Sequence, residues 1–172
     1  MSINYTPRTW TTGEVVTAAY MNNEIMTPFS GLQAAWSTMT PTITATTNPN
    51  LGSAGVTVGR YCQIGKTVFV RGTLTFGGTG IGGGTGQWVL NLPVPATIIN
   101  IANSFTHIHV GYLCAAGRYV GQAIISDNGG SPPSGSMWVQ DSATSMTATQ
   151  AGTPGVWSAG AYTFFDGVLE SA

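Results

Sequence analysis

The sequence predicts an all-β protein, an antiparallel β-sandwich of the jelly-roll kind, with a short helical segment ahead of it. From residue 40 onward, apolar and polar residues alternate with a period of two, and clusters of glycine, proline and small polar residues separate the alternating stretches. Strands without helices between them pair antiparallel. With 172 residues, the chain is long enough to bury a core of its own. We therefore expect an N-terminal attachment and helical segment at 1–39 and a β-sandwich head domain at 40–172.

Only one segment, near the N-terminus, carries a helical period. Its apolar residues recur at steps of three or four, close to the repeat of about 3.5 residues that lines one seam of a coiled coil. Thr11 and Glu14 have the spacing of a capping box, so we expect a helix from about residue 14 or 18 to about 38. Pro28 predicts a kink or a break, because proline inside a helix removes a hydrogen bond and clashes with the preceding turn. The apolar residues of this edge are Met21, Ile25, Phe29, Leu32, Trp36 and Met39.

This apolar edge is a candidate for self-association. A narrow apolar stripe on an isolated helix of this length must be covered, because such a helix is marginal in water. The cover could be the chain's own β domain. We favour a short bundle of identical helices from other copies, because the edge precedes the β region as a leading stalk. The residues expected to hold the copies together are Ile25, Phe29, Leu32, Trp36 and Met39.

Eight strands are expected in the remainder of the chain. The clearest are 56–64 and 67–76, which a tight hairpin joins at Gly65 and Lys66, where glycine can take a positive φ. The other expected strands are 87–92, 104–114, 118–126, 136–140, 145–150 and 161–171.

The charge content excludes several classes of partner. Charged residues make up 6% of the chain and the net charge is −1, whereas soluble proteins average about 25% charged residues. A protein that binds nucleic acid through its phosphates needs a cluster of basic side chains, and a membrane span needs about 18 consecutive apolar residues. We therefore expect neither nucleic acid nor membrane as a partner. A surface near zero net charge favours association between copies.

The glycine-rich run and the two cysteines have structural explanations that involve no ligand. Gly78, Gly80 and Gly83 have the GxGxxG spacing of a dinucleotide site, but a strand follows where the phosphate would need a helix N-terminus, so a long flexible loop is expected. Cys62 and Cys114 stand in apolar surroundings without the spacing of a metal site, so two buried free thiols are expected. No cofactor is implied.

Two pairs of residues are considered as catalytic or metal-binding groups. Asp166 and Glu170 share one face of the last strand, and only a pair of carboxyl groups across a cleft would suit a polysaccharide hydrolase. We assign no catalytic residue. His107 and His109 point to one face of their strand, opposite an apolar set. They are expected to be ordinary surface histidines; on a threefold axis, three copies could together bind a metal.

Aromatic residues are the candidates for binding sugar. Trp138, Trp157 and Tyr119 could stack on sugar rings if they lie at a loop-lined end of the sandwich. The alternative is that these side chains belong to the core.

Several motifs resemble those of small structural proteins of tailed bacteriophages, particularly phages of actinobacterial hosts. The matching stretches are Thr6-Pro7-Arg8-Thr9-Trp10, Gly13-Glu14-Val15-Val16-Thr17-Ala18-Ala19 with Asn22, 32–36, Gly59-Arg60-Tyr61, Gly65-Lys66-Thr67-Val68 and Leu92-Pro93. In such proteins the N-terminal segment is an attachment and oligomerisation element, usually trimeric, and the β domain projects from the particle. The resemblance implies a protein made in the host cytoplasm and placed on the outer surface of the virion, at tail or head.

The residues and the resemblance together favour a non-enzymatic tail-tip or fibre protein. The expected partners are other copies of the chain, other virion proteins through the N-terminal segment, and a glycan of the host cell envelope. Weak glycan sites gain strength when several copies bind together. Two alternatives remain: a capsid decoration or head-fibre protein without a ligand, and a polysaccharide hydrolase.

Overall fold

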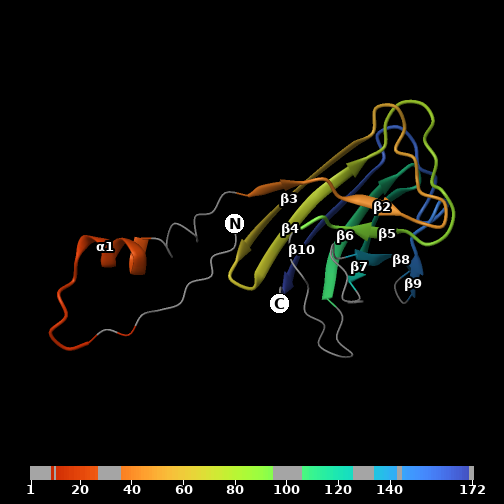
Figure 1. The fold of residues 1–172 in the computed structure, drawn as a ribbon. Coiled ribbons are helices and arrows are strands. Elements are labelled where there is room, and N and C mark those ends of the chain that lie inside the picture. Colours follow the sequence, from red (N-terminus) through yellow and green to blue (C-terminus); the bar gives the residue numbers. More distant parts are fainter. Residues whose placement is uncertain are drawn as a thin grey trace.

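The computed structural model describes residues 9, 11–26, 36–94, 106–125, 134–142 and 145–170, and antiparallel strands dominate it (Figure 1). The predicted all-β class is confirmed. Within the described residues, no helix is both long enough and apolar enough to cross a membrane.

The N-terminal helix is shorter than expected. Helix α1 (Ala18–Met21) begins after Thr17, whose side chain accepts a hydrogen bond from the backbone N–H of Tyr20 at 3.2 Å. One π-helical turn, η1 (Asn22–Met26), follows it. Thr11 and Glu14 do hydrogen-bond to each other, but they close a turn ahead of the helix. Pro28 lies outside the described residues.

The prediction of a helix to about residue 38 is wrong at its C-terminal end. Ser37–Met39 forms strand β1, and Trp36 directly before it is not helical. Met39 is the register partner of Gly59 and is buried in the core of its own chain. Burial against the sheet overrides the local three-and-four spacing. Of the other residues expected to join copies, Phe29 and Leu32 lie outside the described residues.

All eight predicted strands are present within a few residues of their expected ends, and two short strands, β1 and β2, were not predicted. The strands are β1 (Ser37–Met39), β2 (Thr42–Thr44), β3 (Val56–Ile64), β4 (Thr67–Thr75), β5 (Val89–Asn91), β6 (Thr106–Cys114), β7 (Gly117–Ile125), β8 (Ser134–Ser142), β9 (Ser145–Ala148) and β10 (Tyr162–Glu170).

The strands form one curled antiparallel sheet. Its order is β1-β3-β4-β10-β6-β7-β8-β5-β2, with β9 paired to β8. Because these pairings join all ten strands, the jelly-roll sandwich of two separate sheets is not confirmed. Figure 1 shows the short strands β2 and β5 passing across the face of the long strands. Ile43 and Leu90 of these short strands join one core cluster with Val70, Ile108 and Phe165 of the long ones.

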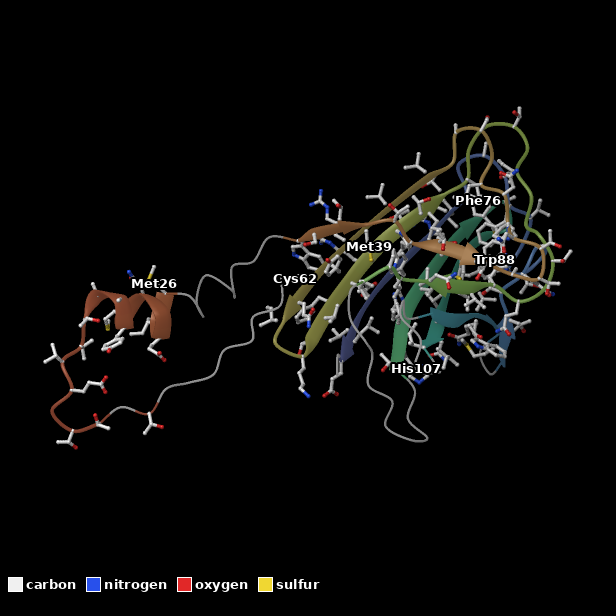
Figure 2. All side chains as sticks on the ribbon, in the orientation of Figure 1. Met26, Met39, Cys62, Phe76, Trp88 and His107 are labelled. Atoms are coloured by element: carbon white, nitrogen blue, oxygen red, sulfur yellow. The ribbon has the colours of Figure 1, made fainter. Side chains whose placement is uncertain are left out.

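An aromatic cluster fills the core near the loops that join the strands. Trp157 lies with its ring centroid 5.0 Å from that of Phe76 and 4.6 Å from that of Trp88. The indole N–H of Trp88 donates to the carbonyl of Gly83 at 2.9 Å. Figure 2 shows Phe76 and Trp88 at this loop end, with His107 near the opposite end of β6.

The glycine-rich run lies between strands β4 and β5, where the sequence predicts a loop. Its backbone pairs with the segment between β2 and β3, through bridges that join Thr47 to Thr85 and Asn50 to Gly82. The next element is strand β5, so the run lacks the helix N-terminus that a dinucleotide site requires. As predicted, Cys62 and Cys114 are buried and do not form a disulfide with each other.

Candidate functional site

The outer face of the five long strands, β3, β4, β10, β6 and β7, is unusually apolar. Antiparallel sheets with one solvated face normally present polar side chains there. Here several large apolar side chains are exposed, and a gathering of exposed apolar side chains on one face can mark an interaction site. The exposed residues on this face are Val56, Val58, Phe69, Val120, Phe164 and Val168.

A row of charged residues crosses the same face. The strand register places Arg60 opposite Arg71, Arg71 opposite Asp166, and Asp166 opposite His109. The Nδ1 atom of His109 lies 3.2 Å from Oδ1 of Asp166, and the two side chains are 50% and 64% exposed. An exposed pair of this kind contributes at most about 1 kcal/mol to stability. The row therefore contributes little to the stability of the fold, although it concentrates most of the charge on this face.

A hollow of about 360 Å³ lies beside this row, across β3, β4 and β10. Between its two walls lie Gly59, Gly72 and Phe165, which are cross-strand neighbours. One wall is formed by Arg60, Arg71 and Asp166. The other is formed by Val58, Thr73 and Phe164, each two residues away on the same strand. The hollow thus joins a charged wall to an apolar one.

Phe164 is held in place by its neighbours. Its ring lies against Gly111, at the position where any larger residue would put a Cβ atom. His109 and Tyr162 flank the ring, with centroids 5.9 and 6.4 Å away. On its other side, Phe164 lines a second hollow of about 300 Å³ together with Arg118 and other residues. One fixed aromatic ring therefore separates two neighbouring hollows.

The aromatic residues expected to bind sugar are not brought together. Trp157 is buried in the aromatic core and cannot meet a ligand from solvent, which corrects its assignment. Tyr119 is half-buried and packs against the core. Trp138 is half-buried on β8, opposite Gln122. Trp157 therefore follows the core alternative, which the sequence left open because strand alternation does not extend into its loop.

The histidines lie as the strand pattern predicted. His107 and His109 are both exposed, on the face opposite the buried Ile108 and Val110. In the part of the chain that the structure describes, no three histidine, cysteine or acidic side chains are close enough to hold a metal ion. The threefold-axis site remains a prediction about an assembly.

The two carboxylates of the last strand do not suit a glycosidase. Asp166 and Glu170 are exposed on the same face of β10, four residues apart, which is about 13 Å along a strand. A glycosidase pair needs its carboxyl groups about 5 to 9.5 Å apart. Their spacing does not favour the hydrolase alternative.

Tyr112 carries the buried polar contact between β6 and its neighbours. Its hydroxyl donates to the carbonyl of Trp138 at 3.1 Å and accepts from Oγ1 of Thr149 at 2.9 Å. Burial raises the pKa of this phenol well above its ordinary value, against a smaller lowering by the bond from Thr149. The phenol is therefore a neutral structural group.

The described part of the N-terminal apolar edge is uncovered in the single chain. Helix α1 contains no buried residue, and Met21, Ile25 and Met26 are all exposed. Trp36, by contrast, lies beside the sheet, where the guanidinium of Arg71 stacks over its ring at 4.6 Å from the centroid. The edge therefore divides into an exposed part before residue 27 and a part that belongs to the sheet from residue 36 onward.

Comparison with known proteins identified no matching family model, no similar curated protein and no similar solved structure.

Proposed function

We propose that this protein is a structural protein of a bacteriophage virion, a trimer at the tail tip or fibre that attaches the particle to its host. In this proposal the N-terminal segment joins the copies and docks on other virion proteins. The β domain then faces outward, toward the cell envelope.

The exposed apolar edge carries the assembly part of the proposal. Met21, Ile25 and Met26 present apolar side chains to solvent from a helical segment too short to be stable alone. Identical segments of other copies would cover these side chains. The net charge of −1 gives little repulsion between copies.

Multivalent binding explains how such a protein could attach. A single exposed site on a sheet face binds a sugar weakly. Linked copies raise the effective concentration of the second and third sites, so weak contacts add up to useful avidity. The sequence resemblance to phage structural proteins supplies the virion context.

Light scattering of the purified chain tests the assembly. We expect a mass near three times 17.8 kDa for the wild type and 17.8 kDa for a chain with Met21→Asp and Ile25→Asp. Val156→Asp is the control, because Val156 is also an exposed apolar residue but lies in a loop of the β domain. A wild type of 17.8 kDa at high concentration, or a double variant that keeps the wild-type mass, would refute the proposal.

Two further observations separate the tail role from a decoration role. Antibody labelling of virions in electron micrographs distinguishes head from tail. A decoration protein without a ligand would bind capsids saturably and give no signal on an array of envelope glycans, and this result would replace the attachment role.

A further inference from the structure

The chain's few positively charged residues include one pair of direct neighbours. It has five lysines and arginines in 172 residues, and two of them, Arg60 and Arg71, are direct cross-strand partners on the exposed face. Like charges directly opposite each other destabilise a pair of strands. Among the described residues, neither guanidinium forms an ion pair with a carboxylate. Oδ1 of Asp166, the residue opposite Arg71, lies 3.2 Å from Nδ1 of His109. An anion bound between the two arginines would remove this repulsion.

The two guanidinium groups can reach one ligand. Opposite residues of an antiparallel pair have Cα atoms about 4.5 to 5.5 Å apart, and their side chains project from the same face of the sheet. Arg71 is oriented by stacking on the ring of Trp36, which leaves the N–H groups at the edge of its plane available. Arginine pairs with carboxylate and phosphate groups through two parallel hydrogen bonds.

The remaining wall of the hollow suits a sugar ring. Phe164 offers an exposed aromatic ring held by Gly111, and Val58 extends this apolar wall. Thr73 and Asp166 add a hydroxyl and a carboxylate that can bond to sugar hydroxyls. At about 360 Å³, the hollow is at the lower end of the range for small-molecule sites.

We infer that the hollow formed by Arg60, Arg71, Val58, Thr73, Phe164 and Asp166 binds an acidic sugar residue, whose carboxylate or phosphate lies between the two arginines while its ring packs on Phe164. The second hollow, beyond Phe164, continues the site toward Arg118 and receives the next residue of a polysaccharide. This inference deepens the proposed function, because it names the class of envelope glycan. A second copy of this chain is a poorer occupant, because packing this face on itself would bury four unpaired arginines.

Saturation-transfer NMR at low salt tests the site by measuring whether small probes bind to the protein. The probes are methyl glucuronide, glucose 6-phosphate, methyl glucoside and inorganic phosphate. We expect binding of at least one acidic sugar, with the neutral glucoside and inorganic phosphate at least tenfold weaker. Comparing the affinities for methyl glucuronide and glucose 6-phosphate shows whether the site prefers a carboxylate or a phosphate.

Substitutions locate the binding. Arg60→Gln and Arg71→Gln should each lower the affinity for the acidic sugar at least tenfold. Arg71→Lys should also lower this affinity, although it keeps the charge, because lysine cannot form two parallel hydrogen bonds to one oxyanion. Phe164→Ala should weaken binding by a similar factor. Lys66→Gln is the charge-matched control, because it removes one exposed positive charge at the β3–β4 turn and should leave binding unchanged.

The outcomes separate this inference from the proposed assembly. The double variant Met21→Asp, Ile25→Asp should bind the probes as the wild type does, whether or not the wild type is a trimer. The inference fails if no probe binds, if all four bind equally, or if the arginine variants bind normally. It also fails if these variants change the oligomeric mass and leave sugar affinity unaltered, since the face would then be an interface between copies.

Discussion

Replacing Tyr112 with phenylalanine tests the buried contact between strands β6, β8 and the end of β9. The substitution keeps the ring, which lies edge-on to Trp157 at 6.3 Å, and removes only the hydroxyl. The carbonyl of Trp138 then loses a donor, and the fully buried hydroxyl of Thr149 loses its acceptor. A buried polar group left without a partner costs about 1 to 3 kcal/mol.

We therefore expect Tyr112→Phe to lower the free energy of unfolding by about 1 to 3 kcal/mol, equivalent to roughly 3 to 10 °C in the melting temperature. Urea unfolding followed by tryptophan fluorescence measures this change. The matched substitution Thr149→Val removes the partner hydroxyl and leaves the Tyr112 hydroxyl bonded to Trp138. It should cost about 1 kcal/mol or less.

The double variant decides whether the contact is the cause. With both hydroxyl groups replaced, no side-chain donor is left without an acceptor, so the combined loss should be smaller than the sum of the single losses by about 1 kcal/mol. Additive losses, or a Tyr112→Phe variant within about 0.3 kcal/mol of the wild type, would refute the reasoning.

Three further predictions follow from buried groups. The pKa of Tyr112 is raised in the folded state. The contribution of the neutral phenol to folding stability is therefore complete below the unfolded pKa of about 10, and it is lost as the pH rises above that value, by about 1.4 kcal/mol per pH unit. Urea midpoints at increasing pH should fall in the wild type and stay flatter in Tyr112→Phe. Thr163→Val should stabilise the fold by about 1 kcal/mol in urea unfolding, because the buried Thr163 hydroxyl has no hydrogen-bond partner in the described structure; a loss of stability would contradict this. Gly121→Ala should cost about 1 to 3 kcal/mol of stability in the same assay, because a Cβ atom there would overlap the carbonyl oxygen of Trp138. Gly152→Ala is the control. Its Cβ atom would meet no atom within 4 Å, so it should change stability by less than about 0.5 kcal/mol.

The long strands were predictable because each repeats its alternation several times. Strand β3 was predicted with its exact ends, and β4 within one residue, since a two-residue turn at Gly65 and Lys66 also sets their register. Strands β1 and β2 have three residues each, too few to show a period of two. Met39 lies on a three-and-four spacing that fits a helix equally well, so only its burial in the sheet identifies it as a strand residue.

The candidate site was predictable only in part. Arg60 and Arg71 are equally distant from the hairpin turn, so the sequence alone could have placed them opposite each other. Asp166 and His109 join the row through pairings of β10 with β4 and β6, which are far apart in the sequence. No local pattern determines which distant strands become neighbours. Phe164 was missed for the same reason, because its ring is placed by Gly111 of β6.

The outer face combines features that a purely structural surface has no need of. Its exposed valines and phenylalanines make no contribution to the core on the opposite side of the sheet. Its arginine pair opposes the pairing of β3 with β4, although these strands form the clearest hairpin in the chain. Repulsion between the two arginines weakens this pairing, and the arginine pair lines one hollow together with Val58 and Phe164. Natural proteins keep such locally unfavourable choices mainly where a site requires them. The arginine pair is therefore better explained by the acidic ligand that we propose than by the stability of the fold.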